Sequence, residues 1–133
     1  MAAETNETAQ ERQKRIKQVY YNKKRAEKIT LPFEEFYAWY EQQEQKCCYC
    51  GITEAEIARL IASGKLINKR LPQRGRRLEL DRKNSSKGYN DFDNLALACY
   101  WCNNAKTDTF THEEFKKIGQ GFKQIWQDRL KEL

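Results

Sequence analysis

The sequence lacks any apolar stretch long enough to span a membrane, and its first ten residues lack the apolar segment of a secretory signal. We therefore expect an intracellular protein with no membrane partner. Thiols stay reduced inside cells, so disulfide bonds are disfavoured there. The five cysteines of the chain are then better explained as metal ligands or buried thiols.

Size and charge narrow the class of protein further. A length of 133 residues is typical of one domain, and a hydrophobic fraction of 39% builds only a modest core. A chain of this kind often needs an additional stabilising element such as a metal ion. The 25 Lys and Arg residues exceed the 19 Asp and Glu residues, which gives a net charge of +6. This excess favours a polyanionic partner, with nucleic acid first.

The first thirty residues differ in character from the rest. Residues 1–10 are polar without an apolar period, so we expect a disordered N-terminus. Residues 11–28 hold eight basic and two acidic side chains, and 11–30 is predicted to form a basic helical arm. Such an arm is either a solvated surface helix or a segment along a phosphate backbone, since charge runs are uninformative alone. Residues 31–133 are expected to form the main domain.

The apolar periodicity and the turn residues predict a mixture of helices and strands. The capping box of Thr53 with Glu56, and that of Thr111 with Glu114, each mark the start of a helix. The expected elements are helix 30–46, helix 53–63, strand 77–82, strand 94–99, helix 100–106, a helix from 111 that Gly119 and Gly121 break, and helix 122–130. The predicted fold class is therefore α+β.

Two Cys-X-X-Cys pairs, Cys47 with Cys50 and Cys99 with Cys102, are the strongest motif. A gap of two residues lets one tight turn offer two thiolates to the same tetrahedral ion. Four cysteines make a closed site, so we predict one structural Zn²⁺ ion and no catalysis at that ion. Cys48 could replace Cys47 as a ligand, although the spacing to Cys50 favours Cys47.

A basic segment lies between the two cysteine pairs. Residues 65–77 contain six basic side chains and no acidic one, and Pro72 and Gly75 favour an extended loop. We expect this loop to contact phosphates. The predicted nucleic-acid-binding residues are Arg70, Arg74, Arg76, Arg77, Lys83, Lys87 and Lys106.

The order of these motifs resembles the HNH endonucleases of the ββα-metal fold. The resemblance covers about residues 33–118 and rests on CxxCG, LELDR, GYNDFDNLALACYWCNNAKTD and THEEF. It implies a zinc-held core of a two-stranded antiparallel hairpin and one helix, with flanking helices. It also implies an enzyme that hydrolyses phosphodiester bonds in DNA, more than in RNA, with Mg²⁺ or another divalent ion.

The resemblance also implies roles for individual residues. Asp81 matches the aspartate that helps to bind the divalent ion, and Asn103 matches the second ligand on the helix, with Asn104 as its neighbouring alternative. Asn94 matches the asparagine that fixes the loop, and Lys106 a basic residue common at its position. Carboxylate and amide oxygens are hard ligands that suit Mg²⁺.

The sequence departs from the family at the general base. Arg82 stands where the family has a histidine, and arginine stays protonated in proteins. The single histidine, His112, lies after the motif and is not an obvious substitute. Another group then activates the water, or the ion lowers the pKa of the water, or the site is inactive. Loss of a base typically costs about 10²–10⁴ in rate.

Two other functions stay open at this stage. An inactive HNH-derived module, binding nucleic acid or serving a structural role in a larger assembly, would explain Arg82, because arginine suits phosphate contact better than proton transfer. A zinc-organised protein-interaction domain is compatible with the many aromatic residues, although the basic segment 65–77 argues against it.

Overall fold

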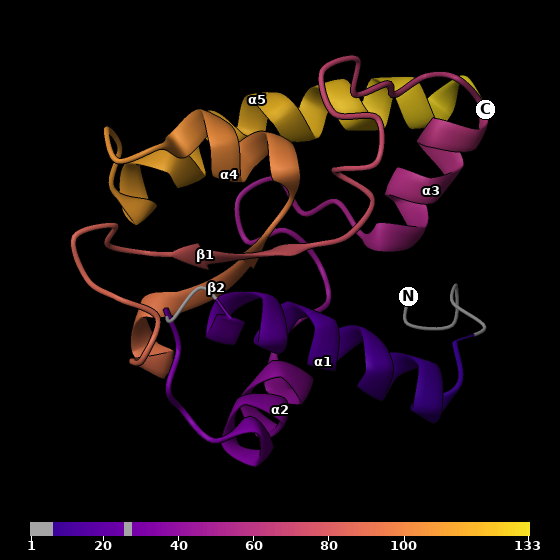
Figure 1. Cartoon of the computed structure of the whole chain (residues 1–133). Helices are drawn as coiled ribbons and strands as arrows, with labels where there is room; N and C mark the ends of the chain where they lie inside the picture. Colours follow the sequence, from indigo (N-terminus) through magenta and orange to yellow (C-terminus); the bar gives the residue numbers. More distant parts are fainter. Residues whose placement is uncertain (1–6, 26–27) are drawn as a thin grey trace.

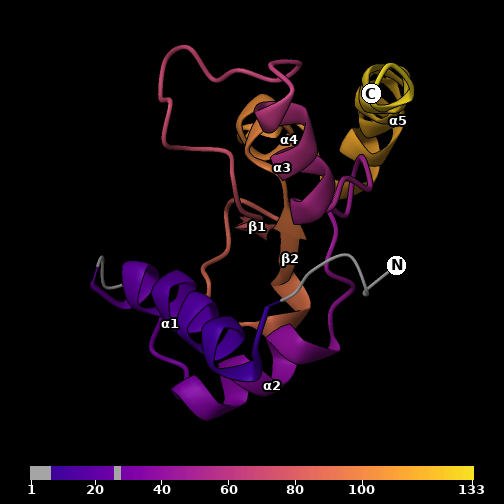
Figure 2. The ribbon, with the colours of Figure 1, turned by 90° about the vertical axis from the view of Figure 1, so that its right-hand side faces the viewer.

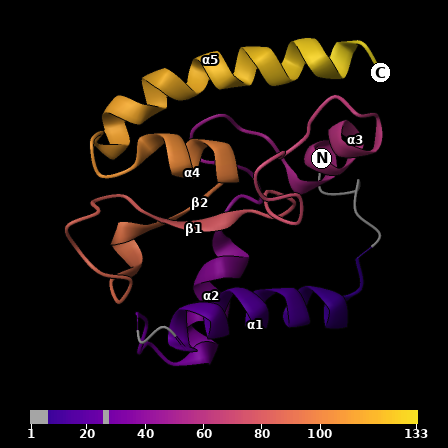
Figure 3. The ribbon, with the colours of Figure 1, turned by 45° about the horizontal axis from the view of Figure 1, so that its top comes forward.

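The structure is a computed structural model that describes residues 7–25 and 28–133. Figure 1 shows the two strands in the middle of the molecule, between α4 and α5 on one side and α1 and α2 on the other. The view in Figure 3 shows the same layers. The elements are α1 (Ala9–Arg25), α2 (Phe33–Gln42), α3 (Glu54–Ala62), β1 (Glu79–Arg82), the 3-10 helix η2 (Phe92–Asn94), β2 (Leu95–Ala98), α4 (Tyr100–Lys106) and α5 (His112–Lys131).

The two strands form one antiparallel pair. Their register runs from Glu79 opposite Ala98 to Arg82 opposite Leu95. Each strand is slightly shorter than the segment predicted for it, and helix α4 follows β2 at the predicted residues. The predicted α+β class, with a hairpin followed by a helix and flanked by further helices, is confirmed.

Strand β1 is covered on both faces. Leu80 is buried on one face, together with Leu78 directly before the strand. Asp81, the next residue along the strand, is also buried, with 3% of its surface exposed. Helix α4 and the segment around Tyr49 cover this second face, since Lys106 and Tyr49 both reach the carboxylate of Asp81.

The C-terminal part of the chain forms one helix where the sequence predicted two. Helix α5 runs without interruption through Gly119 and Gly121. A Cβ atom at Gly119 would lie 2.5 Å from the backbone oxygen of Tyr49, so glycine serves there for close packing. Gly121 has no neighbouring atom within 4 Å of its Cβ position. Neither glycine breaks the helix, because hydrogen bonds and the packing of the helix outweigh their low helix propensity.

The basic helix α1 is docked on the domain and is not a free arm. Ile16 and Tyr20 are fully buried, and the ring of Tyr20 lies 5.3 Å from that of Phe36 in α2. Helix α1 begins at Ala9, so the end of the segment expected to be disordered is helical, while residues 1–6 lie outside the described part. Helix α2 ends at Gln42, earlier than predicted. Among the described residues, no helix combines the length and apolar character that crossing a bilayer requires.

Candidate functional site

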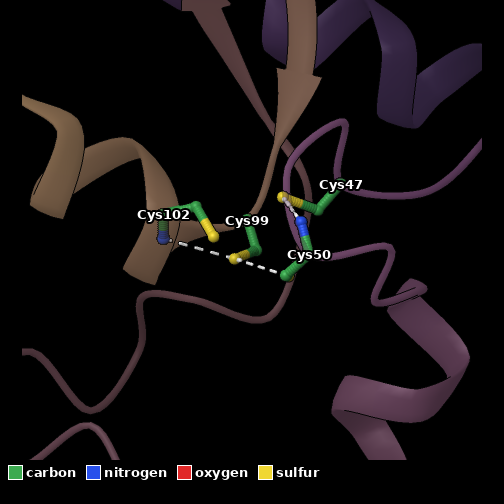
Figure 4. A group of neighbouring side chains, drawn as sticks. All are labelled: Cys47, Cys50, Cys99 and Cys102. Carbon is green, nitrogen blue, oxygen red and sulfur yellow. Dashed lines mark hydrogen bonds between the residues drawn. The ribbon is translucent and has the colours of Figure 1, made fainter. Parts of the chain in front are cut away.

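Four cysteine side chains converge next to the hairpin. Figure 4 shows Cys47 and Cys50 on the loop after α2, facing Cys99 and Cys102 at the start of α4. All four are buried, and their sulfur atoms lie within 4.8 Å of one another. The backbone N–H of Cys50 donates to the sulfur of Cys47 at 3.5 Å, and that of Cys102 to the sulfur of Cys99 at 3.4 Å. The cluster has the composition and spacing of a site for one metal ion.

The loop of the first cysteine pair is fixed by its own backbone. The N–H of Gly51 donates to the carbonyl of Cys47 at 2.9 Å, and Gly51 adopts a φ of 77° that suits glycine. The N–H of Cys48 donates to the carbonyl of Leu97 in β2 at 2.8 Å. The hairpin and the cysteine cluster are therefore joined through the main chain.

The fifth cysteine lies outside the cluster. Burial, followed by the charges of Cys47 and Asp81, raises the pKa of the Cys48 thiol and disfavours its thiolate. Its sulfur lies instead within 4.8 Å of ligand atoms of Asp81 and His112. Cys47 and not Cys48 completes the four-cysteine cluster, as the spacing favoured.

Asp81 is held by two side chains of different kind. The hydroxyl of Tyr49 donates to its Oδ2 at 2.5 Å, and the ammonium of Lys106 lies 3.5 Å from its Oδ1. Lys106 also donates to the carbonyl oxygen of Arg82 at 2.8 Å. Burial raises the pKa of the Asp81 carboxyl, while the contacts with Tyr49 and Lys106 oppose that shift.

Tyr49 connects Asp81 to the only histidine. The hydroxyl oxygen of Tyr49 lies 2.9 Å from Nδ1 of His112, the first residue of α5. The Tyr49 hydroxyl has one proton, which it donates to Asp81. In the contact with His112 the hydroxyl oxygen is therefore the acceptor, and Nδ1 of His112 carries the proton that is donated. Burial, and then Lys116 and Lys83, lowers the pKa of His112. Burial and the hydrogen bond with Asp81 raise the pKa of Tyr49, so this phenol keeps its proton at neutral pH.

A pocket of about 360 Å³ opens on the other side of Asp81. Its lining residues are Leu80, Asp81, Arg82, Ser85, Tyr89, Asn103, Lys106, Thr107 and Asp108. Asn103 donates its amide N–H to Oε1 of Glu79 at 3.0 Å, which leaves the amide oxygen for another partner. Neither Tyr49 nor His112 lines this pocket. Asp81 and Asn103, the two predicted ligands of the divalent ion, thus share one pocket at the meeting of β1 and α4.

Arg82 points along the loop that borders this pocket. Its guanidinium lies 5.0 Å from the centre of the Tyr89 ring and donates to the carbonyl of Lys87 at 3.4 Å. Lys23 of α1 lies over the same ring, at 4.6 Å. Tyr89 therefore contacts both a side chain of the pocket and a side chain of α1.

Asn94 ties the loop between the strands together. Its amide oxygen accepts from the N–H of Asn84 at 2.9 Å, and its amide N–H₂ donates to the carbonyls of Asn84 and Gly88 at 3.1 and 3.2 Å. It is 6% exposed, and its own carbonyl accepts from Lys83. This arrangement fits the loop-fixing role that the resemblance implied.

The residues predicted to contact nucleic acid differ in how far their side chains are exposed. The exposed ones are Arg70, Arg74, Arg76, Arg77 and Lys87. Lys83 is half-buried. Lys106 is 2% exposed and paired with Asp81, so it lies at the base of the pocket and not on an open surface.

Sequence reasoning missed two residues around Asp81. Tyr49 stands inside the first cysteine pair, which places it beside the cluster, and this position was the signal that could have found it. His112 is the only histidine and begins a helix directly after the motif. Its position next to Tyr49 follows from the packing of α5, which the sequence does not reveal.

Comparison with known proteins agrees with this geometry. A family model described as HNH endonuclease matches residues 80–109, which include most of β1 and all of β2 and α4. A solved structure of the rare-cutting HNH restriction endonuclease PacI is similar, with a TM-score of 0.64 and 30% sequence identity over 85% of this chain and 77% of that one. The search of curated proteins finds no match. The chain belongs to the HNH endonuclease family.

Proposed function

We propose that this protein cleaves DNA by hydrolysing a phosphodiester bond in the pocket beside Asp81. The observation that carries the proposal is that Asp81 and Asn103, two side chains with oxygen ligands, line one pocket at the meeting of β1 and α4. The similarity to a restriction endonuclease supports DNA as the substrate.

Asp81 and Asn103 would hold a divalent ion, with Mg²⁺ as the candidate. A carboxylate and an amide oxygen are suitable ligands for this ion, which keeps several waters of its own. When bound, such an ion offsets the charge that develops on the phosphate oxygens and on the leaving group. The residues fit this ion because Asn103 has its amide oxygen available, and because Asp81 forms one ion pair, with Lys106, among the residues that the structure describes.

The other pocket residues would bind and orient the DNA. Arg82 places a permanent positive charge at the pocket, which suits contact with a phosphate. Asn94 holds the loop that directly follows Arg82. Lys106 keeps the buried carboxylate of Asp81 charged and in place.

A second cluster of ligand atoms competes for the same carboxylate. Cys48, Asp81 and His112 offer sulfur, oxygen and nitrogen atoms within 4.8 Å. Sulfur and imidazole ligands select softer ions than Mg²⁺. In addition, neither Cys48 nor His112 lines the pocket. We therefore place the catalytic ion on the Asn103 side.

The four-cysteine cluster would bind one Zn²⁺ ion with a structural role. Four cysteines leave a tetrahedral zinc ion no open position for a substrate. Zinc would then join the loop of Cys47 to the start of α4, and so fix α4 against β1.

The test is cleavage of plasmid DNA by the purified full chain over a range of Mg²⁺ and Mn²⁺ concentrations. We expect nicking that depends on the divalent ion and is lost in Asp81→Asn and in Asn103→Ala, while His112→Ala retains ion-dependent activity. Cleavage that survives Asp81→Asn would refute the proposal. Loss in His112→Ala with retention in Asn103→Ala would move the ion to the cluster with Cys48.

A binding module without catalysis is the second candidate, because Arg82 lines the pocket and no histidine does. It predicts salt-sensitive binding of nucleic acid and no cutting with any divalent ion. The same assay with single-stranded and double-stranded DNA and with RNA separates the substrates. Absence of any nucleic-acid binding at low salt would instead favour a protein-interaction domain.

A further inference from the structure

A second open space adjoins the pocket of Asp81. It is a groove of about 440 Å³ between helix α1 and residues 73–78. Leu80 and Asn103 line both the groove and the pocket, so the two spaces meet at β1 and α4. Figure 2 shows α1 and the segment before β1 on the same side of the two strands. A chain that occupied the pocket could continue into the groove.

One wall of the groove is a single stripe of α1. The lining residues on this helix are Arg15, Gln18, Val19, Asn22 and Lys23. Their spacing of three and four residues places them on one helical face. Lys23 also reaches Tyr89, whose ring Arg82 contacts as well. The stripe is therefore polar along most of its length and ends beside the pocket.

The opposite wall is basic and held in place. Gly75 packs against the Trp101 ring, where a Cβ atom would lie 2.8 Å from the indole, and its φ of 94° favours glycine. Arg74 pairs with Glu79 at 3.0 Å. The N–H of Leu78 donates to Glu54 at 2.8 Å. These contacts fix the segment before any ligand binds, which lowers the entropic cost of binding.

The charge of the groove is strongly positive. Five of its lining residues are cationic and one, Glu79, is acidic. Arg15 pairs with Glu7 and Glu54, and Arg74 with Glu79. Within residues 7–25 and 28–133, neither Arg76 nor Arg77 forms an ion pair. Arg76 and Arg77 thus offer two exposed guanidinium groups without a direct ion pair in this part of the chain. Glu7, whose pKa is lowered by its hydrogen bond with Arg15 and also by the charge of Arg77, is the acid with which a phosphate would compete.

We propose that this groove binds the sugar–phosphate backbone of one DNA strand, directly beside the phosphate that is cut. The inference rests on the proposed function, since the adjoining pocket defines where cleavage occurs. The volume of the groove is that of a ligand site and not of a duplex, which restricts the occupant to part of one strand. Arg76 and Arg77 contact its phosphates, and the stripe of α1 forms the facing wall.

The test measures binding without cleavage. The full chain with Asp81→Asn is titrated with a fluorescent DNA duplex and with a single strand at several salt concentrations. Adding Arg76→Ala and Arg77→Ala should weaken binding about tenfold and reduce the salt dependence by about two counter-ions. Adding Lys117→Ala and Lys123→Ala is the matched control, because it removes the same charge from exposed positions of α5. This control should change binding far less.

A variant that keeps every charged residue tests whether DNA binding depends on the position of the segment 73–78 and not only on the net charge. Gly75→Ala must displace the segment from Trp101, so it should weaken binding although no cation is lost. Gly121→Ala on α5, where no atom lies within 4 Å, should leave binding unchanged. Circular dichroism verifies the fold of each variant.

The outcomes distinguish the groove from the cleavage reaction. Equal binding losses in the groove variants and in the α5 control would refute the groove, even if the wild-type chain cuts DNA. Selective losses in the groove variants would support it, even if no divalent ion produced cutting. Tight binding of Gly75→Ala would overturn the claim that the fixed position of the segment matters.

Discussion

The carboxylate of Asp81 is enclosed, with the ammonium of Lys106 near one oxygen and the hydroxyl of Tyr49 on the other. The carboxylate and the ammonium are both almost completely buried, at 3% and 2% exposure. A buried charge is tolerated because its partner compensates it. The same carboxylate is the proposed ligand of a divalent ion, so Lys106 and the ion supply the same kind of compensation.

Replacement of Lys106 tests whether a divalent ion can compensate the charge of Asp81 in place of the ammonium group. Lys106→Met leaves Asp81 buried and without its counter-charge, which should cost about 3–5 kcal/mol in the free energy of unfolding. A divalent ion at Asp81 should restore part of that loss. We expect Mg²⁺ to raise the melting temperature of the variant more than that of the wild type in thermal unfolding. Lys87→Met, an exposed control, should respond as the wild type does. Equal Mg²⁺ effects in all three proteins would contradict the prediction.

His112 makes stability depend on pH. Its pKa is lowered below the ordinary value of 6.5 by burial and by Lys116, Lys83 and Lys106, with Glu113 opposing them. The unfolded chain therefore binds a proton at higher pH than the folded one, so stability falls as the pH drops below about 6.5. His112→Gln should lose this component. We expect melting temperature to decline less in the variant than in the wild type between pH 7.5 and 5.5. A steeper decline in the variant would show that the shift has the opposite sign.

At the scale of elements, α5 illustrates how packing changes the meaning of a residue. Gly119 lies where the helix touches the backbone of Tyr49, so it brings α5 against the loop of the first cysteine pair. Gly121 has open space at its Cβ position and is exposed. Two glycines that look alike in the sequence have different consequences in the folded chain.

The two glycines form a matched pair for mutation. Gly121→Ala should stabilise the protein by about 0.5–1 kcal/mol, because alanine loses less entropy in a helix. Gly119→Ala should destabilise it, because the new methyl group would lie 2.5 Å from the oxygen of Tyr49. Chemical denaturation of both variants measures the difference. Stabilisation by both substitutions would mean that α5 does not lie close to Tyr49.

Local signals made much of the fold predictable. The capping boxes of Thr53 and Thr111, the cysteine pairs and α4 depend on residues close together in the chain, and the structure contains them where expected. The continuity of α5 and the burial of Asp81 depend on segments that are distant in sequence. Such contacts leave no local pattern, because a glycine or an acidic residue has the same appearance in either environment.

The residues of the candidate site also fall into those with a local sequence motif and those brought together by distant segments. Asp81, Asn94 and Asn103 stand at positions matched by the motif, and the structure places Asp81 and Asn103 in one pocket. The contact of Tyr49 with His112 joins residues 63 positions apart, and it arises because α5 crosses the first cysteine pair.

For the molecule as a whole, the metal centre joins two distant parts. Bonds to Cys47 and Cys50 on one side, and to Cys99 and Cys102 on the other, would enclose the segment that contains α3, the basic loop and both strands. Zinc binding contributes about 10–16 kcal/mol in small zinc domains, which is comparable with the total stability of a domain. Removal of the ion should therefore unfold this part of the chain.

Single cysteine substitutions test that expectation. Cys50→Ser should lower the zinc content below one ion per chain and greatly reduce the melting temperature. Cys48→Ser should retain one zinc ion and most of the stability, since its sulfur lies outside the cluster. Metal analysis and circular dichroism of the two variants provide the measurement. Loss of zinc in Cys48→Ser would exchange the roles of Cys47 and Cys48.

The sequence separation between the cysteine pairs also bears on synthesis of the protein. Cys50 and Cys99, whose sulfur atoms lie 3.7 Å apart, are 49 residues apart in the chain. The chain is synthesised from its N-terminus, so the first pair and Asp81 leave the ribosome before the second pair does. Until then the segment has neither α4 nor a complete ligand set. Assembly of the proposed cleavage site is thereby postponed until residue 102 has left the ribosome, and a nascent chain that ends before this residue cannot complete the cysteine cluster.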